Sequence, residues 1–212
     1  HEDPRRQRQM CIRDRFGFVG YREMDGQAIY TLMTKNVPNS TIHGVELEFD
    51  WTPYEAGRLF GWVSMLDTEN GGSSSAEATQ DGYLCMERAL IGADPCNPDG
   101  TIDLSGKHLT WSPELSWNLQ FEHNTYTGNG FRIMNIINVN YTGEMFYNES
   151  NYDNEPFHSG RDDLHTVNTS MVFINEANAW GLEFYIHNAT DELIKTDSYP
   201  ANAGYVKAMY AP

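Results

Sequence analysis

Acidic side chains along one short segment have the spacing that comes nearest to catalytic chemistry. Glu46, Glu48 and Asp50 alternate along "VELEFDW", so an extended chain places all three on the same side. Two carboxylates on one face could serve as the acid and the base of a glycosidase, and the same row also fits a strand face wetted by solvent. The sequence contains no Gly-x-Ser-x-Gly, phosphate-loop or His-Glu-x-x-His motif. We therefore predict no enzyme, no catalytic residue and no cofactor-binding residue.

A second acidic stretch, "DPCNPDGTID", matches a calcium-binding loop only in part. When Gly100 is placed at the invariant glycine, Asn97, Asp99 and Asp103 occupy ligand positions. The first and last ligand positions, however, fall on a proline and a glycine. The histidines are scattered, and no two of them have the spacing of metal ligands. The sequence therefore predicts a turn-rich loop here and no metal site.

The three cysteines leave one thiol without a partner. Cys85 and Cys96 fall in the same loop-like region and could pair in an oxidising compartment, whereas Cys11 has no evident partner. The residue pattern alone does not decide whether the bridge between Cys85 and Cys96 forms.

The charge distribution separates the first residues from the rest. A net charge of -16 argues against a nucleic-acid partner, whose phosphates would be repelled. The range 1–15 is nevertheless rich in arginine. This range could be a basic arm, a short tail, or a sequence foreign to the domain, and we favour the third interpretation. We therefore expect 1–15 to lie outside the fold and 16–212 to form one domain.

Alternation of apolar and polar residues predicts the elements that carry these side chains. Clear period-2 patterns occur at 45–51, 115–121, 131–141, 167–173 and 180–186, and less regular ones at 28–33 and 59–66. The patterns predict an all-β fold, an antiparallel up-and-down meander of about seven or eight long strands. Each strand has one apolar and one polar face, and we expect the apolar residues to point out of a curved sheet.

Short and long connections alternate along this meander. The long ones cover about 68–110 and 148–162, and the short ones cover 52–57, 125–130 and 175–179. Outer-membrane barrels sort their connections in this way, with tight turns at one rim and long loops at the other. The Greek-key connections of a soluble sandwich mix lengths. The alternation of short and long connections therefore favours part of a transmembrane β-barrel.

Three stretches resemble the C-terminal barrel of TonB-dependent outer-membrane receptors. They are "HGVELEFDWTP" at 43–53, the run "RLFGWVSMLDTE" that follows, and "WGLEFYIHNATDE" at 180–192. The similarity covers about residues 28–212. The plug, the energy-coupling box and the closing strand of that family have no counterpart here, so we expect an incomplete segment of a barrel.

The resemblance implies a function and a location. It implies energy-coupled uptake of a scarce ligand, such as a siderophore, a cobalamin or an oligosaccharide, across the bacterial outer membrane. The implied partners are outer-membrane lipid, the small-molecule or oligosaccharide ligand, and the inner-membrane energy-coupling complex, reached through the plug. The alternative is a soluble, secreted all-β carbohydrate-binding module.

Aromatic and arginine side chains of the two long loops are the candidate ligand contacts. Both residue types are common at binding surfaces. The candidates are Tyr83, Arg88, Tyr147, Tyr152 and Arg161.

Overall fold

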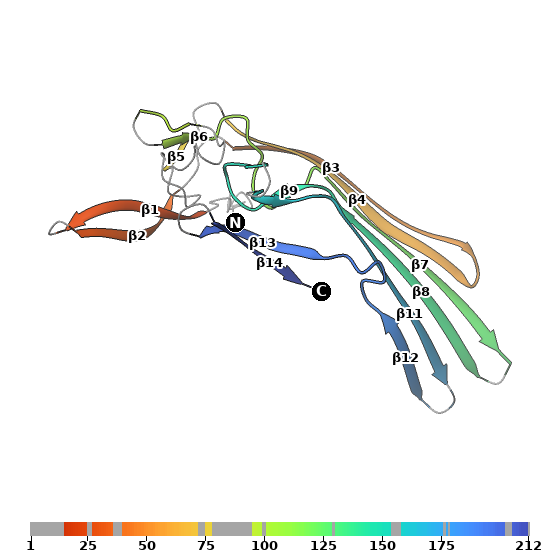
Figure 1. Ribbon diagram of the computed structural model, residues 1–212. Helices are drawn as coiled ribbons and strands as arrows, with labels where there is room; N and C mark the ends of the chain where they lie inside the picture. The colour runs from red at the N-terminus through yellow and green to blue at the C-terminus, as the bar shows by residue number, and fades with distance from the viewer. Residues whose placement is uncertain are drawn as a thin grey trace, which may run out of the picture.

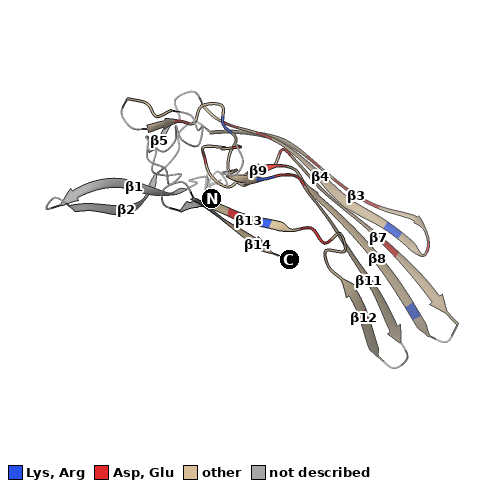
Figure 2. Ribbon diagram, in the orientation of Figure 1, with Lys and Arg blue, Asp and Glu red and all other residues tan. Residues whose placement is uncertain are grey.

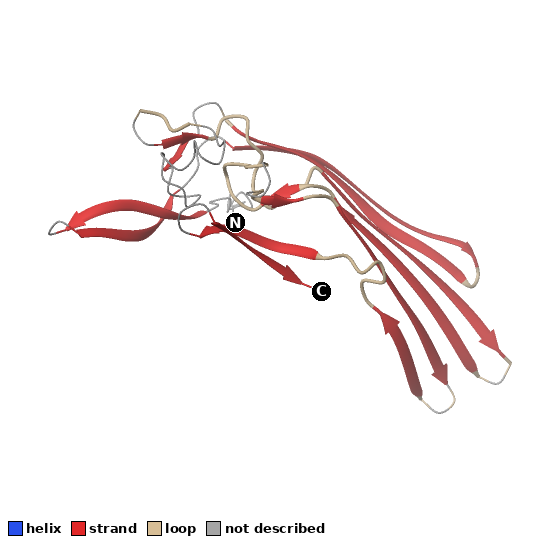
Figure 3. Cartoon of the chain, in the orientation of Figure 1, coloured by secondary structure: helices blue, strands red, loops and turns tan. Residues whose placement is uncertain are grey.

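The computed structural model describes a fold built from β-strands (Figures 1 and 3). The described residues are 15–24, 27–35, 40–71, 75–77, 95–98, 101–128, 130–153, 158–175, 177, 179–201 and 205–211. Among them no helix is long and apolar enough to cross a membrane.

Six long strands form one antiparallel sheet, in the order β12-β11-β8-β7-β4-β3. The strands are β3 (Ser40–Tyr54), β4 (Gly57–Asn70), β7 (Leu115–Thr127), β8 (Phe131–Thr142), β11 (Leu164–Asn175) and β12 (Trp180–Ile186). Every neighbouring pair is antiparallel. The predicted all-β antiparallel meander is therefore confirmed. Within the described part of the chain, β3 and β12 are the two edges and the sheet does not close on itself.

Four two-stranded ladders accompany the sheet. They are β1 (Arg15–Met24) with β2 (Gln27–Lys35), β5 (Ser75–Glu77) with β6 (Thr101–Asp103), β9 (Met145–Phe146) with β10 (Gly160–Arg161), and β13 (Ile194–Ala201) with β14 (Tyr205–Ala211). The β5–β6 ladder lies within the predicted long loop 68–110, and β10 lies within the predicted loop 148–162, whereas its partner β9 precedes that loop. The first strand begins at Arg15, and the rest of the predicted N-terminal tail lies outside the described residues.

Connections at the two ends of the sheet differ in length. Residues 55–56, 128–130 and 176–179 make the tight turns at one end, and residues 71–114 and 143–163 make the long connections at the other (Figure 1). We call the described residues of 71–114 and 143–163 the loop layer. The third connection at this end is the short stretch 187–193.

That third connection is held by one asparagine. Asn188 has a φ of 49°, and its side-chain oxygen accepts from the backbone N–H of Glu192 at 3.1 Å. Its amide nitrogen donates to the Glu192 carbonyl at 2.9 Å. Asparagine adopts the left-handed conformation more readily than most residues and bonds to nearby backbone. The stretch "NATDE" is therefore a compact turn closed by its own first residue.

The strand register gathers the apolar residues on one face. Leu47 pairs with Val63, Val63 with Trp117, and Trp117 with Tyr141. We call the whole set the apolar band: Val45, Leu47, Phe49, Trp51, Leu59, Val63, Met65, Leu115, Trp117, Leu119, Phe121, Phe131, Ile133, Ile137, Val139, Tyr141, Val167, Met171, Phe173, Trp180, Leu182, Phe184 and Ile186. As the alternation predicts, its members on both edge strands are exposed; Leu47 and Phe184 each expose 60% of their surface.

Polar side chains form a ladder across the opposite face. Asn118 donates to Asn140 at 2.6 Å, Asn140 donates to Asn138 at 2.7 Å, and Asn138 donates to Gln120 at 3.3 Å. This face is less uniformly polar than the sequence pattern indicated. Towards the tight turns it also carries apolar residues, which are Phe60, Trp62, Met134, Ile136, Val172 and Ile174.

Charged residues are sparse in the middle of the sheet (Figure 2). Among Lys, Arg, Asp and Glu, the strands β7, β8 and β11 carry only Glu122 and Arg132. The buried apolar residues lie elsewhere. Ile102, Leu104 and Leu109 are at most 2% exposed, and all three belong to the loop layer. Among the described residues, no buried apolar side chain comes from the six-stranded sheet.

Candidate ligand site at the loop end of the sheet

A hollow of about 490 Å³ opens at the loop end of the sheet. Residues of 158–164, of the turn 187–193, and of β13 and β14 surround it. The lining residues are His158, Arg161, Asp162, Asp163, Leu164, Glu192, Leu193, Lys195, Ala208 and Tyr210. Two cations and three carboxylates therefore face one space, together with a phenol and an imidazole.

Arg161 is the predicted contact residue that lines this hollow. It lies on β10, opposite Met145. Its Nε and Nη1 atoms are buried, and neither has a hydrogen-bond acceptor among the described residues. Burial lowers the pKa of the guanidinium, and the nearby Tyr147 opposes that shift. A half-buried cation with free donors is suited to an anionic ligand group, because such a group would supply the missing acceptors.

Tyr147, a second predicted contact, is placed inside the loop layer. It is 8% exposed, and its ring packs against Trp111 with 4.7 Å between centroids. Its hydroxyl donates to the backbone carbonyl of Lys195 on β13. Burial raises the pKa of the Tyr147 phenol to about 12. The side chain therefore stays neutral and ties β13 to the loop layer behind Arg161.

Tyr152, the third predicted contact that is described, is also 8% exposed. Its backbone N–H donates to the Ser159 hydroxyl at 2.8 Å, and its carbonyl accepts from the Ser159 N–H at 2.7 Å. The other two predicted contacts, Tyr83 and Arg88, lie outside the described residues.

Cys96, one of the two cysteines predicted to pair, forms a disulfide. Its predicted partner, Cys85, lies outside the described residues. Cys96 packs against the buried cluster of Ile102 and Leu104.

The acidic row and the calcium-like stretch serve local contacts. Asp50 forms a salt bridge with Arg58 at 2.6 Å, which favours the ionised carboxylate over the protonated form that a general acid needs. The Asp103 carboxylate accepts from both the backbone N–H and the hydroxyl of Ser105, at 2.8 and 2.6 Å. These bonds lower the pKa of Asp103 and close a turn. Asp99 lies outside the described residues.

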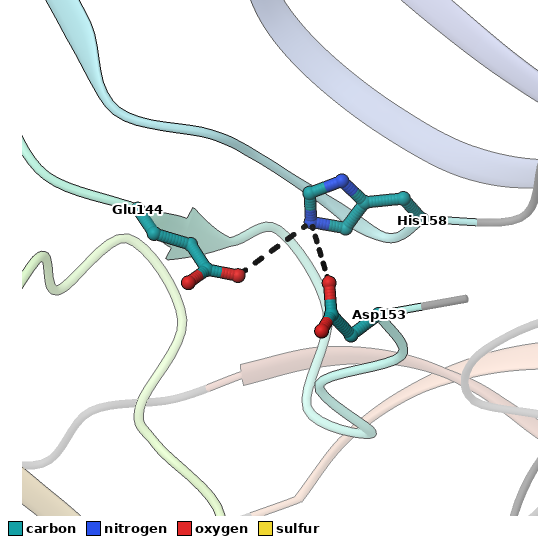
Figure 4. A group of neighbouring side chains, drawn as sticks. All are labelled: Glu144, Asp153 and His158. Atoms are coloured by element: carbon teal, nitrogen blue, oxygen red, sulfur yellow. Dashed lines mark ion pairs between the residues drawn. The ribbon is translucent and has the colours of Figure 1, made fainter. Parts of the chain in front are cut away.

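The structure also brings together three residues that the sequence did not single out. Glu144, Asp153 and His158 converge beside the hollow, and their ligand atoms all lie within 4.8 Å of one another (Figure 4). Nothing in their sequence spacing indicates the cluster. The β9–β10 ladder, in which Gly160 pairs with Phe146, folds this connection back on itself, and the side chains of Glu144 and His158 meet beside that ladder.

No protein-family model matches the sequence, and no curated protein matches it. Two solved receptor structures do resemble the fold. The ferric yersiniabactin uptake receptor FyuA from Yersinia pestis superposes with a TM-score of 0.63 at 16% identity, over 84% of this chain and 23% of that receptor. BauA, the ferric preacinetobactin receptor from Acinetobacter baumannii, gives 0.51 at 12% identity, over 92% of this chain and 24% of that receptor.

The chain thus spans less than a quarter of the length of either receptor. At these identities the likeness concerns the fold, which resembles the barrel part of TonB-dependent receptors.

Proposed function

We propose that this chain forms a section of the barrel wall and outer loops of a bacterial outer-membrane receptor. The receptor imports a scarce ligand, and a ferric siderophore is the ligand class that we favour. The names of the two structural neighbours support that class, because both are receptors for ferric ligands. Cobalamins and oligosaccharides are the other classes to test. Energy would reach the receptor through a plug and an inner-membrane complex, as in the family that the sequence resembles.

The observation that carries this proposal is the slant of the apolar band across the sheet. The band runs from Val45 to Trp51 on β3 and from Trp180 to Ile186 on β12. Successive cross-strand partners connect Trp51 on one edge strand to Ile186 on the other. Trp51 is the member of the band nearest the tight turns on β3, whereas Ile186 is the member nearest the loops on β12.

This slant measures the tilt of the strands. The band keeps the same positions on β3, β4 and β7, and it moves by about six residues, or roughly 20 Å, between β7 and β12. Averaged over all the strand spacings of the sheet, which sum to about 24 Å, this shift corresponds to a tilt of about 40°. Strands of membrane-spanning barrels tilt by about 35–45°. When tilted strands cross a flat lipid layer, the apolar residues shift along the chain from one strand to the next, as they do here. Packing against a second sheet does not require such a shift.

Aromatic pairs mark the borders of the band. On the loop side Trp117 stacks on Tyr141, with 5.8 Å between ring centroids. On the turn side Phe131 meets Trp180 edge to face at 5.9 Å. Aromatic girdles at both borders are typical of the lipid-facing surface of such barrels.

The alternative, a soluble carbohydrate-binding module, requires a partner for the apolar band. In a sandwich a second sheet packs about 10 Å away and covers such a face. Among the described residues the members of the band on both edge strands are exposed, so no second sheet covers them there. The receptor proposal therefore accounts for the band better.

Cell fractionation combined with uptake tests the proposal. We expect the protein in the outer-membrane fraction, resistant to alkaline carbonate and shifted by heating in gel electrophoresis. Deletion of its gene should abolish accumulation of radioactive iron from one member of a panel of ferric siderophores. The wild-type gene should restore uptake, and Arg161→Gln should restore less than the control Arg58→Gln. A protein found in the soluble fraction would overturn the location, and unchanged uptake of every panel member would overturn the siderophore class.

A further inference from the structure

We propose that Glu144, Asp153 and His158 bind a divalent transition-metal ion, with Zn²⁺ as the best match. The His158 Nε2 atom lies 4.0 Å from a Glu144 carboxylate oxygen and 3.8 Å from an Asp153 carboxylate oxygen. Figure 4 shows the imidazole pointing between the two carboxylates, which come from either side of it. The inference does not depend on the receptor role.

The separations suit a metal ion better than direct hydrogen bonds. Both exceed the roughly 2.7–3.2 Å of a nitrogen–oxygen hydrogen bond. Two ligand atoms each about 2.1 Å from a tetrahedral ion lie roughly 3.4 Å apart. The ligand atoms of Glu144, Asp153 and His158 therefore need to close in by only about an ångström. The carboxylates have room to rotate, because their side chains are 51% and 72% exposed.

His158 is the fixed member of the site. Its side chain is 6% exposed, and its backbone carbonyl accepts from Lys195 Nζ at 2.9 Å and from Ser198 Oγ at 3.3 Å. Gly160 makes room beside the ring. A Cβ at that position would lie 2.2 Å from the Met145 carbonyl oxygen and 3.0 Å from His158 Nε2. The imidazole is thus held in place before any ion arrives, which is what a metal site requires of its first ligand.

The donor set selects the class of ion. One imidazole nitrogen with two carboxylate oxygens suits Zn²⁺ and neighbouring transition metals, whereas Ca²⁺ and Mg²⁺ prefer oxygen ligands alone. The exposed carboxylates leave one side open to solvent, so water could complete the coordination. A bound ion would link Glu144, which precedes β9, to Asp153 and His158. It would thereby restrain His158, which lines the hollow.

Zinc titration of the full chain in detergent micelles tests the site. We expect the protein to compete with a chromophoric chelator for Zn²⁺ and to bind one equivalent. An excess of Ca²⁺ should leave the zinc affinity unchanged. His158→Gln should weaken binding by more than the roughly 10–100-fold that follows loss of an outer-shell partner. Asp153→Asn and Glu144→Gln should each weaken it too. Absence of stoichiometric binding, or equal affinity in His158→Gln, would overturn the proposal.

An exposed pair elsewhere provides the matched control. His165 Nδ1 lies 4.0 Å from an Asp163 oxygen, and both side chains are 55% exposed. His165→Gln should therefore leave zinc affinity unchanged. Co²⁺ absorption gives a second readout: the wild type and His165→Gln should show the same visible bands, and His158→Gln, checked for its heat-modifiable fold, should lose them. Equal loss in both variants would contradict the assignment.

Discussion

The six-stranded sheet and the loop layer differ in how much of their apolar side chains they expose. The sheet exposes them, as Leu47 and Phe184 show. The loop layer buries them, with Leu104 at 0% exposure. Apolar side chains left uncovered in a continuous band indicate an apolar surrounding, because water would penalise each of them by about 25 cal/mol per Å². The loop layer keeps most of its large apolar residues inside, as a surface that meets water does, and Trp111 is an exposed exception at 54%.

The largest expected difference comes from the same substitution made in both regions. Leu104→Ala removes a fully buried side chain and should lower the free energy of unfolding by about 3–5 kcal/mol. Leu47→Ala removes a side chain that is 60% exposed, and should cost less than about 1 kcal/mol. Urea unfolding in detergent measures both values. Similar costs for the two variants would remove the distinction between sheet and loop layer.

Charge placed on the two faces of β7 should act next most strongly. Leu119 belongs to the apolar band, and its neighbour Gln120 belongs to the polar ladder. Leu119→Arg should destabilise the protein in lipid bilayers by about 2–4 kcal/mol, the cost of arginine at the lipid face. Gln120→Arg, on the face that carries the polar ladder, should lower the stability much less. The stability of each variant in vesicles decides, and a larger cost for Gln120→Arg would reverse the assignment of the faces.

Removal of the polar ladder should have a smaller effect. Asn140 bonds to Asn118, Asn138 and Thr166. Asn140→Ala should cost about 1–2 kcal/mol, because a net hydrogen bond contributes about 1 kcal/mol and some partners find water instead. Asn135→Ala, on the other face of the same strand, serves as the control. Equal unfolding midpoints for Asn140→Ala and wild type would show that the ladder adds nothing.

Alkaline pH should affect only the loop layer, and only weakly. Tyrosine in an unfolded chain titrates near pH 10, and the pKa of Tyr147 in the folded protein is raised to about 12. The stability linked to the neutral phenol is therefore complete below about pH 10 and is lost as the pH rises towards 12. Phenolate absorbance in wild type and Tyr147→Phe should differ by one late-titrating group. Superimposable curves would contradict this placement.

Local alternation was enough to predict the sheet, and too little to predict the site. In "WGLEFYIH" each second residue is apolar, so the strand and its two faces follow from Trp180, Leu182 and Phe184 alone. The loop contacts depend instead on pairing between distant residues. Arg161 and Tyr147 come together only when β9 and β10 pair. The cluster of Glu144 and His158 likewise joins residues that lie on either side of this ladder, and no short spacing in the sequence encodes it.

The face that carries the polar ladder also shows what alternation could not predict. Met134 and Val172 occupy positions that alternation assigns to the polar side, and the register places them next to each other. Alternation correctly separates the faces but does not say what covers each part of a face. That depends on neighbouring strands and on whatever fills the space beside them.

Spin-label accessibility along β7 tests the central claim most directly. Single nitroxides placed in turn at residues 115–121 report collisions with oxygen, which concentrates in lipid, and with a polar nickel chelate, which stays in water. In lipid vesicles, oxygen collisions should peak at Leu115, Trp117, Leu119 and Phe121, and nickel collisions at Ser116, Asn118 and Gln120. If the nickel chelate reaches Trp117 and Leu119 as readily as Asn118 and Gln120, the apolar band does not face lipid and the account is wrong.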